Sequence, residues 1–239
     1  MRIKIAPSLL SADFGRLEEE IREVEEGGAD LLHWDVMDGH FVPNLTVGPS
    51  VISCLRKRTD LPFNIHLMIE KPERYLRRFV EAGGDIITVH VEACENLRRA
   101  LSSLRRMGAK VGVALNPETP LEAVEGVVGE LDLLLIMTVH PGFGNQRLLR
   151  STLPKLRRAG RLVRERGLSL DLGVDGGISV ETVPEVVRAG ANLLVAGTAI
   201  YGQRDRALAI RRLREAASAA LGEAGYLPQQ RRKNSRDRL

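Results

Sequence analysis

The sequence predicts a single-domain (β/α)8 barrel, the α/β architecture known as a TIM barrel. Eight apolar runs of strand length alternate with eight helix-like runs over 239 residues, which is typical of a parallel sheet surrounded by helices. The apolar fraction of 44% is sufficient for one buried core. A doubly wound open sheet would normally show a glycine-rich turn after its first strand, whereas here Pro7, Ser8 and Leu9 stand at that point.

The expected strands and helices alternate along the whole chain. The strands are expected at residues 3–8, 30–37, 62–68, 85–90, 110–115, 132–138, 170–175 and 192–197. The helices are expected at residues 14–27, 49–58, 72–82, 95–107, 120–127, 151–166, 179–189 and 205–221. Continuous apolar runs such as 131–137 are typical of strands that are buried on both faces of a sheet.

Glycine and proline residues mark several of these boundaries. Glycine at a helix C-terminus accepts the left-handed backbone conformation that is common there. Four expected helices end at Gly27, Gly83, Gly108 and Gly190. Proline is tolerated in the opening turn of a helix. Three expected helices carry it there, as Pro72, Pro120 and Pro154.

The basic character of the chain is concentrated at its C-terminal end. Residues 229–239 hold five basic side chains and one acidic side chain, which accounts for the formal net charge of +4. We expect residues 1–222 to form the catalytic barrel and residues 223–239 to be a basic, solvated and disordered tail. A basic run can contact nucleic acid or an acidic surface, but we expect no specific nucleic-acid partner.

Three features favour a cytoplasmic protein without membrane association. No apolar stretch is long and uncharged enough to cross a bilayer. Residues 1–7 enter a strand without the layout of a signal peptide. The two cysteines, Cys54 and Cys94, form neither a metal-ligand pattern nor a disulfide framework, so we expect both to be reduced. We also expect a homo-oligomer.

Four polar residues near the ends of three expected strands predict a metal centre. His33 and Asp35 are two residues apart in one strand, so their side chains lie on one face. His66 lies near the end of the next strand, and Asp175 closes the seventh. Catalytic groups of a barrel sit at the C-terminal ends of its strands, so the four side chains should converge. Mixed histidine and carboxylate ligands suit one divalent cation per chain, Zn²⁺, Fe²⁺, Mn²⁺ or Co²⁺.

Glycine-rich turns after the last three strands predict a phosphate site. They are residues 141–146, Gly176 with Gly177, and Gly197 with Thr198. Loops at this end of a barrel, with free backbone N–H groups and the start of a short helix, are a recurring phosphate site. The expected substrate is therefore a phosphorylated small molecule.

Other residues at the same strand ends complete the expected pocket. Met37, Met68 and Met137 are expected to face inward and to form an apolar floor under the substrate. The loop after the second strand, which contains His40, is a candidate lid, and an ordinary surface connection is the alternative. His90 ends the fourth strand, and it either lines the pocket or has a structural role.

These residues resemble the ribulose-phosphate 3-epimerase family. The resemblance covers residues 3 to about 220, and the block 33–44, which reads HWDVMDGHFVPN, carries it most specifically. Further matching segments are 6–8 (APS), 66–68 (HLM), 137–139 (MTV), 141–144 (PGFG) and 174–178 (VDGGI).

The resemblance implies reversible epimerisation at C3 of D-ribulose 5-phosphate to D-xylulose 5-phosphate, a step of the pentose phosphate pathway, through a metal-stabilised enediolate. It implies that His33, Asp35, His66 and Asp175 hold the metal. Asp35 is then the proton acceptor and Asp175 the donor, and the two exchange roles when the direction reverses. The substrate contacts that it implies are Ser8, His66, Gly142, Phe143, Gly144, Asn145, Asp175, Gly176, Gly177, Gly197 and Thr198.

Three positions depart from the family pattern. Residue 140 is His where Asn or an acidic residue is usual, and residue 145 is Asn where Gly is usual. Asn145 still offers a backbone N–H and tolerates left-handed geometry. Trp34 is bulkier than the usual aliphatic residue and should face the helices, away from the ligand.

The sequence leaves three alternatives. An epimerase of a six-carbon ketose 6-phosphate, such as allulose 6-phosphate, would differ only in the pocket wall. A metal-free barrel lyase or decarboxylase would remain active after metal removal. A non-catalytic sugar-phosphate binder, or a nucleic-acid binder that uses the basic tail, would not need the pair Asp35 and Asp175.

Overall fold

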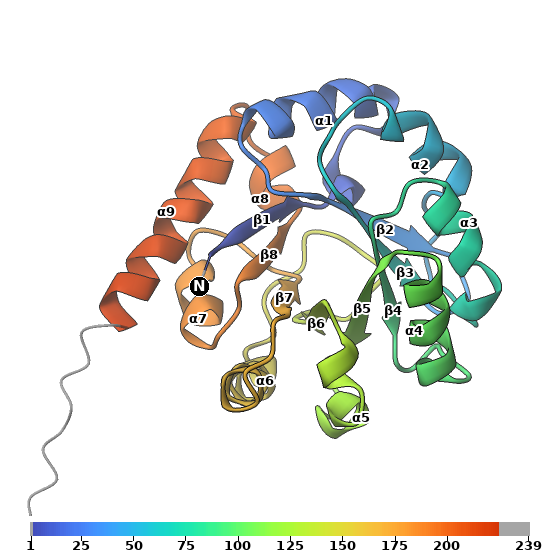
Figure 1. Cartoon of the computed structure of the whole chain (residues 1–239). Coiled ribbons are helices and arrows are strands. Elements are labelled where there is room, and N and C mark those ends of the chain that lie inside the picture. The colour runs from blue at the N-terminus through green and yellow to red at the C-terminus, as the bar shows by residue number, and fades with distance from the viewer. Residues whose placement is uncertain (1, 225–239) are drawn as a thin grey trace, which may run out of the picture.

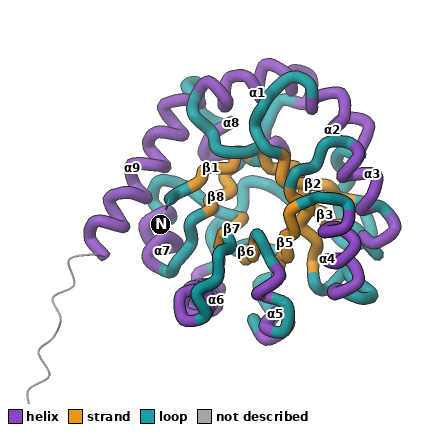
Figure 2. The backbone as a smooth tube through the Cα atoms, in the orientation of Figure 1, coloured by secondary structure: helices purple, strands orange, loops and turns teal. Residues whose placement is uncertain are grey.

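The computed structural model describes residues 2–224 and has the predicted barrel (Figure 1). Within this range, eight parallel strands lie in the order β1-β8-β7-β6-β5-β4-β3-β2, and helices surround them (Figure 2). Ser8 makes a parallel bridge to His33, which closes the ring between β1 and β2. The expected tail, residues 223–239, lies outside the described residues from position 225 onward.

Each strand begins or ends within one or two residues of its predicted boundary. The strands are β1 Lys4–Pro7, β2 Leu32–Met37, β3 Phe63–Met68, β4 Ile86–His90, β5 Lys110–Leu115, β6 Leu133–Met137, β7 Asp171–Asp175 and β8 Leu193–Ala196. The register pairs Asp35 of β2 with His66 of β3 and Met137 of β6 with Asp175 of β7. These pairings bring the polar strand ends to one rim of the barrel.

The helices form the outer layer. They are α1 Leu17–Glu26, α2 Pro49–Arg56, α3 Leu76–Glu81, α4 Leu97–Arg106, α5 Glu122–Glu125, α6 Leu153–Glu165, α7 Val183–Arg188, α8 Thr198–Tyr201 and α9 Arg206–Ala224. The last of them, α9, packs against α7 and α1 and thereby completes the ring of helices (Figure 1).

Three predicted helices begin three or four residues later than expected, for local reasons. The helix expected from residue 72 begins at Leu76, after a 3-10 turn at Pro72–Arg74. The helix expected from residue 14 begins with a 3-10 turn at Phe14–Arg16, where the Asp13 side chain accepts a hydrogen bond from the backbone of Gly15. The helix expected from residue 179 begins only at Val183. The Thr182 hydroxyl donates to the Gly177 carbonyl and accepts from the Ser179 backbone N–H, so this segment forms a turn.

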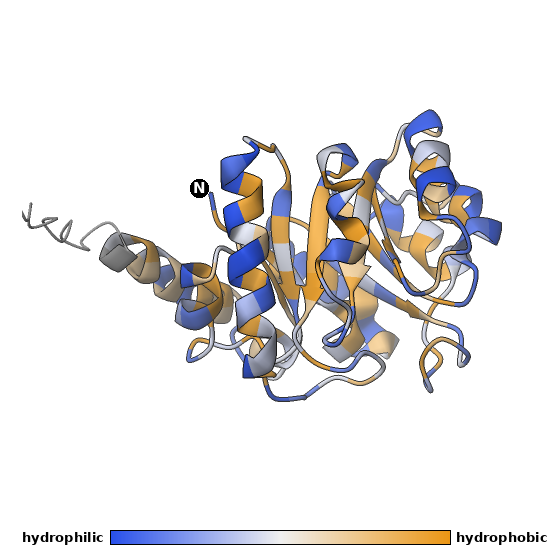
Figure 3. Cartoon of the chain, turned by 90° about the horizontal axis from the view of Figure 1, so that it is seen from below, coloured by the Kyte–Doolittle hydropathy of each residue, from blue (hydrophilic) through white to orange (hydrophobic). Residues whose placement is uncertain are grey.

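Apolar side chains fill both sides of the sheet. Strand residues are apolar where they meet the helices, and the helices turn polar residues outward (Figure 3). Trp34 is 1% exposed and belongs to the helix-facing core, where its ring centroid lies 5.4 Å from that of Phe63. The expected orientation of Trp34 is therefore confirmed. A second cluster, which includes Leu133, Leu135 and Leu193, fills the barrel interior.

A repeated hydrogen-bonded clamp holds the strands at the N-terminal rim of the barrel. A polar residue one or two positions before each even-numbered strand accepts a hydrogen bond, through its side chain, from a backbone N–H of the preceding odd-numbered strand. Asp30 accepts from Ile5, Asp85 from Phe63, Asp132 from Val111 and Asn192 from Leu172, at 2.6–2.9 Å. The same four residues donate their own backbone N–H groups to the carbonyls of those partners. The strand starts are thus fixed at the rim opposite the polar cluster.

Two further expectations concern the chain as a whole. Cys54 and Cys94 are both free cysteines in the structure. Among residues 2–224, no helix has the length and apolar character that crossing a membrane requires.

Candidate active site

The structure brings His33, Asp35, His66 and Asp175 together at the C-terminal ends of β2, β3 and β7. One ligand-type atom from each residue lies within 4.8 Å of the others. Both histidine side chains are fully buried, and the carboxylates of Asp35 and Asp175 are 4% and 15% exposed. Three strands that are distant in sequence thus present two imidazoles and two carboxylates to one point.

The distances within this cluster fit a tetrahedral metal site. Ligand atoms about 2.0–2.1 Å from a tetrahedral zinc ion lie roughly 3.3 Å from one another. The Nε2 atom of His33 lies 3.2 Å from Nδ1 of His66 and 3.2 Å from Oδ1 of Asp35. Nδ1 of His66 lies 3.1 Å from the same Asp35 oxygen. Oδ2 of Asp175 lies 3.6 Å from each of the two histidine nitrogens. The four side chains can therefore hold one divalent cation.

The electrostatics of the cluster favour positive charge. Burial alone would lower the pKa of His33, but the carboxylates of Asp35 and Asp175 raise it to about 10. Burial alone would raise the pKa of Asp35, but His33 and His66 lower it well below its usual range. Metal binding requires a neutral imidazole and an ionised carboxylate. A divalent cation would therefore take the place of the proton that His33 otherwise retains.

The two oxygens of Asp35 have different surroundings. Oδ1 faces the two histidines, whereas Oδ2 accepts a 2.6 Å hydrogen bond from the hydroxyl of Ser8. The Thr46 hydroxyl also donates to the backbone carbonyl of Asp35. Hydrogen bonds to the side chain and to the backbone carbonyl of Asp35 thus fix the orientation of its carboxylate.

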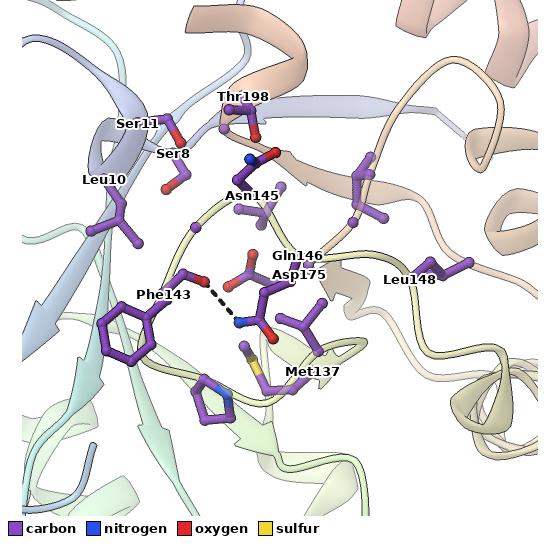
Figure 4. A pocket seen from close by; sticks show the side chains of 18 of the residues that line it. Ser8, Leu10, Ser11, Met137, Phe143, Asn145, Gln146, Leu148, Asp175 and Thr198 are labelled. Atoms are coloured by element: carbon purple, nitrogen blue, oxygen red, sulfur yellow. Dashed lines mark hydrogen bonds between the residues drawn. The ribbon is translucent and has the colours of Figure 1, made fainter. Parts of the chain in front are cut away.

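A cavity of about 460 Å³ opens above the cluster (Figure 4). Its wall contains Asp35, Asp175 and most of the residues expected to contact substrate or to form the floor. These are Ser8, Met37, Met68, Met137, Gly142, Phe143, Gly144, Asn145, Gly176, Gly177, Gly197 and Thr198. Figure 4 shows Ser8, Asn145, Asp175 and Met137 pointing into the same space. His66 and His33 lie beneath this wall and do not line it.

Backbone geometry shapes the loop after β6. Asn145 has a left-handed φ of 58°, the conformation that its amide side chain tolerates. Gln146 donates from Nε2 to the carbonyls of His140 and Phe143, which folds the loop on itself. Figure 4 shows the bond to Phe143. A Cβ atom on Gly177 would lie 2.2 Å from the backbone nitrogen of Leu148, so only glycine allows this close approach.

The loop after β2 reaches over to the loop after β6. Nδ2 of Asn44 donates to the carbonyl of Gly142 at 2.8 Å. His40 is exposed, hydrogen-bonds within its own turn to Asp38, and does not line the cavity. This hydrogen bond thus connects the candidate lid directly to the loop after β6.

Several cavity and supporting residues were not singled out from the sequence. Leu10, Ser11, Ser179 and Thr182 line the cavity, and they lie in loops without a distinctive motif. A buried polar layer also lies behind the histidines. Its members are Asn64, Thr88 and His90, each 0% exposed, with Glu92 beyond them. Of these, the sequence singled out only His90, either as a pocket residue or as a structural one. Polar residues two apart in a strand, such as Thr88 and His90, are the signal that would have pointed to this layer.

An eight-stranded barrel with two histidines and two carboxylates beneath a glycine-lined cavity defines a class of metal-binding (β/α)8 enzymes. The chain belongs to the Ribulose-phosphate 3 epimerase family, whose family model matches residues 4–201. It is 54% identical over 213 residues to ribulose-phosphate 3-epimerase of Bacillus subtilis, covering 89% of this chain and 98% of that protein. The corresponding protein of Methanocaldococcus jannaschii is 45% identical, with 92% and 94% covered.

Solved structures of more distant proteins share the fold. 3-Hexulose-6-phosphate synthase matches with a TM-score of 0.65 and 24% identity, over 90% of this chain and 99% of that chain. KGPDC from Streptococcus mutans matches with a TM-score of 0.67 and 15% identity, over 93% of this chain and all of that chain. These likenesses establish the TIM-barrel architecture.

Proposed function

We propose that this chain is an isomerase that interconverts D-ribulose 5-phosphate and D-xylulose 5-phosphate by epimerisation at C3. Membership of the epimerase family supports the reaction. The observation that carries the chemistry is the placement of Asp35 and Asp175 at the ends of β2 and β7, where both line one cavity and contact the same two histidines. Two carboxylates from separate strands supply the two proton-transfer groups that an inversion requires.

The proposed mechanism begins with the weak acidity of the C3 hydrogen, which arises because the resulting carbanion delocalises onto the C2 carbonyl. Asp35 removes this proton from one face of the substrate, and a planar enediolate forms. Asp175 returns a proton to the opposite face, which inverts C3. In the reverse direction the two residues exchange roles. The Ser8 hydroxyl orients Oδ2 of Asp35 toward this task.

A divalent cation is the proposed cofactor, one per chain, with Zn²⁺, Fe²⁺, Mn²⁺ and Co²⁺ as the candidate ions. The buried set His33, Asp35, His66 and Asp175 would hold it. When bound, it would stabilise the negative charge that develops on the substrate oxygens by on the order of several kcal/mol. The protein holds the carboxylates of Asp35 and Asp175 in fixed positions relative to C3 of the substrate.

Substrate binding is proposed to use the glycine-rich loops for the phosphate group. Gly176, Gly177, Gly197 and Thr198, together with the loop 142–145, line one cavity. Their backbone N–H groups can surround an anion. Met37, Met68 and Met137 lie against the reacting carbons in this proposal, and His66 acts through the cation, because it lies below the cavity wall.

The experiment that tests the function is a set of turnover assays with purified protein. D-Ribulose 5-phosphate and D-allulose 6-phosphate are offered as substrates, each with and without exhaustive chelation. The five-carbon substrate should be epimerised with the higher kcat/KM, and exhaustive chelation should abolish turnover. Preferred turnover of the six-carbon substrate would replace the proposed specificity.

We also propose a cellular location and an assembly state for the protein. The free thiols Cys54 and Cys94 are typical of a reducing compartment, which supports a cytoplasmic location. Leu45, an apolar side chain that is 73% exposed, offers surface for a homo-oligomer. Light scattering coupled to size-exclusion chromatography measures the assembly state directly.

A further inference from the structure

A chain of hydrogen bonds runs from His66 away from the cavity to the loop after β5. Nε2 of His66 lies 2.9 Å from Nε2 of His90, and Nδ1 of His90 lies 3.2 Å from Oε2 of Glu92. Both imidazoles are fully buried, and their ring planes are 21° apart with centroids 5.0 Å apart, so the rings meet edge to edge. Phe41 covers His90, with ring centroids 4.8 Å apart.

Glu92 is held as an acceptor at the outer end of this chain. Its Oε1 accepts from the backbone N–H of Asn116 at 2.7 Å and from the hydroxyl of Thr119. The two hydrogen bonds that Oε1 accepts from Asn116 and Thr119 favour the ionised carboxylate. An ionised carboxylate has no proton to donate. Oε2 must therefore accept a hydrogen bond from Nδ1–H of His90.

The direction of each remaining hydrogen bond follows from this starting point. A neutral His90 that donates from Nδ1 has a lone pair on Nε2. The short contact between the two Nε2 atoms then requires His66 to donate its Nε2–H to His90. A neutral His66 protonated at Nε2 has a lone pair at Nδ1, and Nδ1 is the atom that faces His33, Asp35 and Asp175.

We propose that His90 and Glu92 are positioning residues that fix the tautomer and the orientation of His66 for metal binding. This inference rests on the proposed metal site and adds two residues to it. It also explains why a buried histidine stands at the end of β4 without lining the cavity. Partners of this kind commonly change metal affinity about 10- to 100-fold when they are removed.

Glu92→Gln is the informative substitution because it reverses the direction of the hydrogen bonds from residue 92 through His90 to His66, while the side chain keeps its size and shape. If the new amide oxygen remains with Asn116 and Thr119, the amide nitrogen faces His90 and donates to Nδ1. His90 must then carry its proton on Nε2 and donate to His66, which places the His66 proton on Nδ1 and blocks the ligand position. Thr119→Val is the matched control, because it removes one hydrogen bond to Glu92 and leaves the bond to His90 in place.

The experiment measures the dissociation constant for Zn²⁺ by competition with a chelator in the full-length wild-type protein and in both variants. We expect a 10- to 100-fold weaker constant for Glu92→Gln and a value close to wild type for Thr119→Val. Equal affinity of Glu92→Gln and wild type would overturn the positioning role. Failure of the wild type to bind zinc would instead overturn the proposed metal site.

A second measurement does not depend on any variant. In the zinc-loaded wild-type protein, ¹⁵N chemical shifts of the imidazoles report which nitrogen carries a proton. The proposal requires a protonated Nε2 on His66 and a protonated Nδ1, with a bare Nε2, on His90. A proton on Nε2 of His90 would contradict it.

Discussion

Ser8 and Asp35 are joined by a 2.6 Å hydrogen bond between the end of β1 and the end of β2, at the point where the barrel closes. The bond occupies Oδ2 of Asp35 and leaves Oδ1 to the histidines. One carboxylate therefore has one oxygen for the metal cluster and one oxygen at the cavity wall. This division of the two oxygens makes it possible for a single residue to be both a ligand and a base.

Metal dependence is the first prediction. Because four ligand-type atoms converge in the cluster of His33, Asp35, His66 and Asp175, purified protein should carry about one divalent ion per chain. Exhaustive chelation should abolish turnover, and adding back Zn²⁺, Fe²⁺, Mn²⁺ or Co²⁺ should restore it. Elemental analysis of the same samples gives the metal content. Full activity in verified metal-free protein would be incompatible with the four-ligand site.

The second prediction separates the two carboxylates. Asp35→Asn and Asp175→Asn keep the shape and an oxygen ligand but cannot carry the proton. Each should reduce epimerisation in both directions by roughly 10²- to 10⁴-fold, the usual effect of losing a general acid or base. The metal content of each variant must be measured, because either change also weakens a ligand.

Isotope exchange sharpens this test. In D₂O, a metal-replete variant should still exchange the C3 hydrogen of the epimer that faces its remaining carboxylate, without inverting that carbon. Wild-type rates of epimerisation by metal-replete Asp175→Asn protein would rule out the assignment of two bases.

Asn145 provides the third prediction. Its φ of 58° is favourable for glycine, tolerable for asparagine and costly for alanine, by about 1–2 kcal/mol. We expect Asn145→Gly to retain kcat/KM and Asn145→Ala to raise KM, because the loop that lines the cavity would leave its left-handed turn. Steady-state kinetics with both variants checks this difference. Identical KM values for the two would show that backbone conformation at this position has no effect on binding.

The fourth prediction concerns thiol reactivity. Burial, with a smaller effect from Glu73 and Glu92, raises the pKa of Cys94 to about 12. The thiolate is the reactive form, so at pH 8 Cys94 should be almost entirely protonated and slow to alkylate, and its rate should increase with pH up to about 12. Cys54 is exposed and serves as the internal control. Mass spectrometry after timed labelling should find Cys54 modified first, and equal labelling rates would contradict the prediction.

The fifth prediction concerns the basic C-terminal segment. Because every group assigned to the site lies between Ser8 and Thr198, truncation after Pro228 should leave turnover and the free energy of unfolding unchanged. Enzyme assays and urea denaturation of the two proteins test this. A large fall in kcat/KM would show that the segment reaches an active site or a subunit interface.

Much of the fold could be predicted because each strand is a short apolar run with clear boundaries. The run at 62–68, for example, became β3 Phe63–Met68. The helix starts were less predictable, since a few hydrogen bonds of Thr182 decided where α7 begins. In the site, the two-residue spacing of His33 and Asp35 and the position of all four ligand residues near strand ends were enough to predict that they converge. The other two residues are His66 of β3 and Asp175 of β7.

The support behind the ligands could not be predicted in the same way. Recognising that His90 contacts His66 requires the register between β3 and β4, which no local pattern contains. Asn64 is two residues from His66, so the sequence places both side chains on one face of β3. That spacing does not show that Nδ2 of Asn64 lies 3.2 Å from Nδ1 of His33, which belongs to another strand. Such contacts depend on tertiary packing and appear only in the folded structure.

The clamp at the N-terminal rim divides the barrel into four modules of two strands each. Each module is joined internally by a reciprocal pair of hydrogen bonds, at Asp30, Asp85, Asp132 or Asn192. The metal cluster at the other rim takes ligands from β2, β3 and β7, and therefore from three different modules. An ion bound there would crosslink modules that are otherwise joined by ordinary strand pairing. Metal binding would therefore increase the free energy of unfolding of the whole barrel.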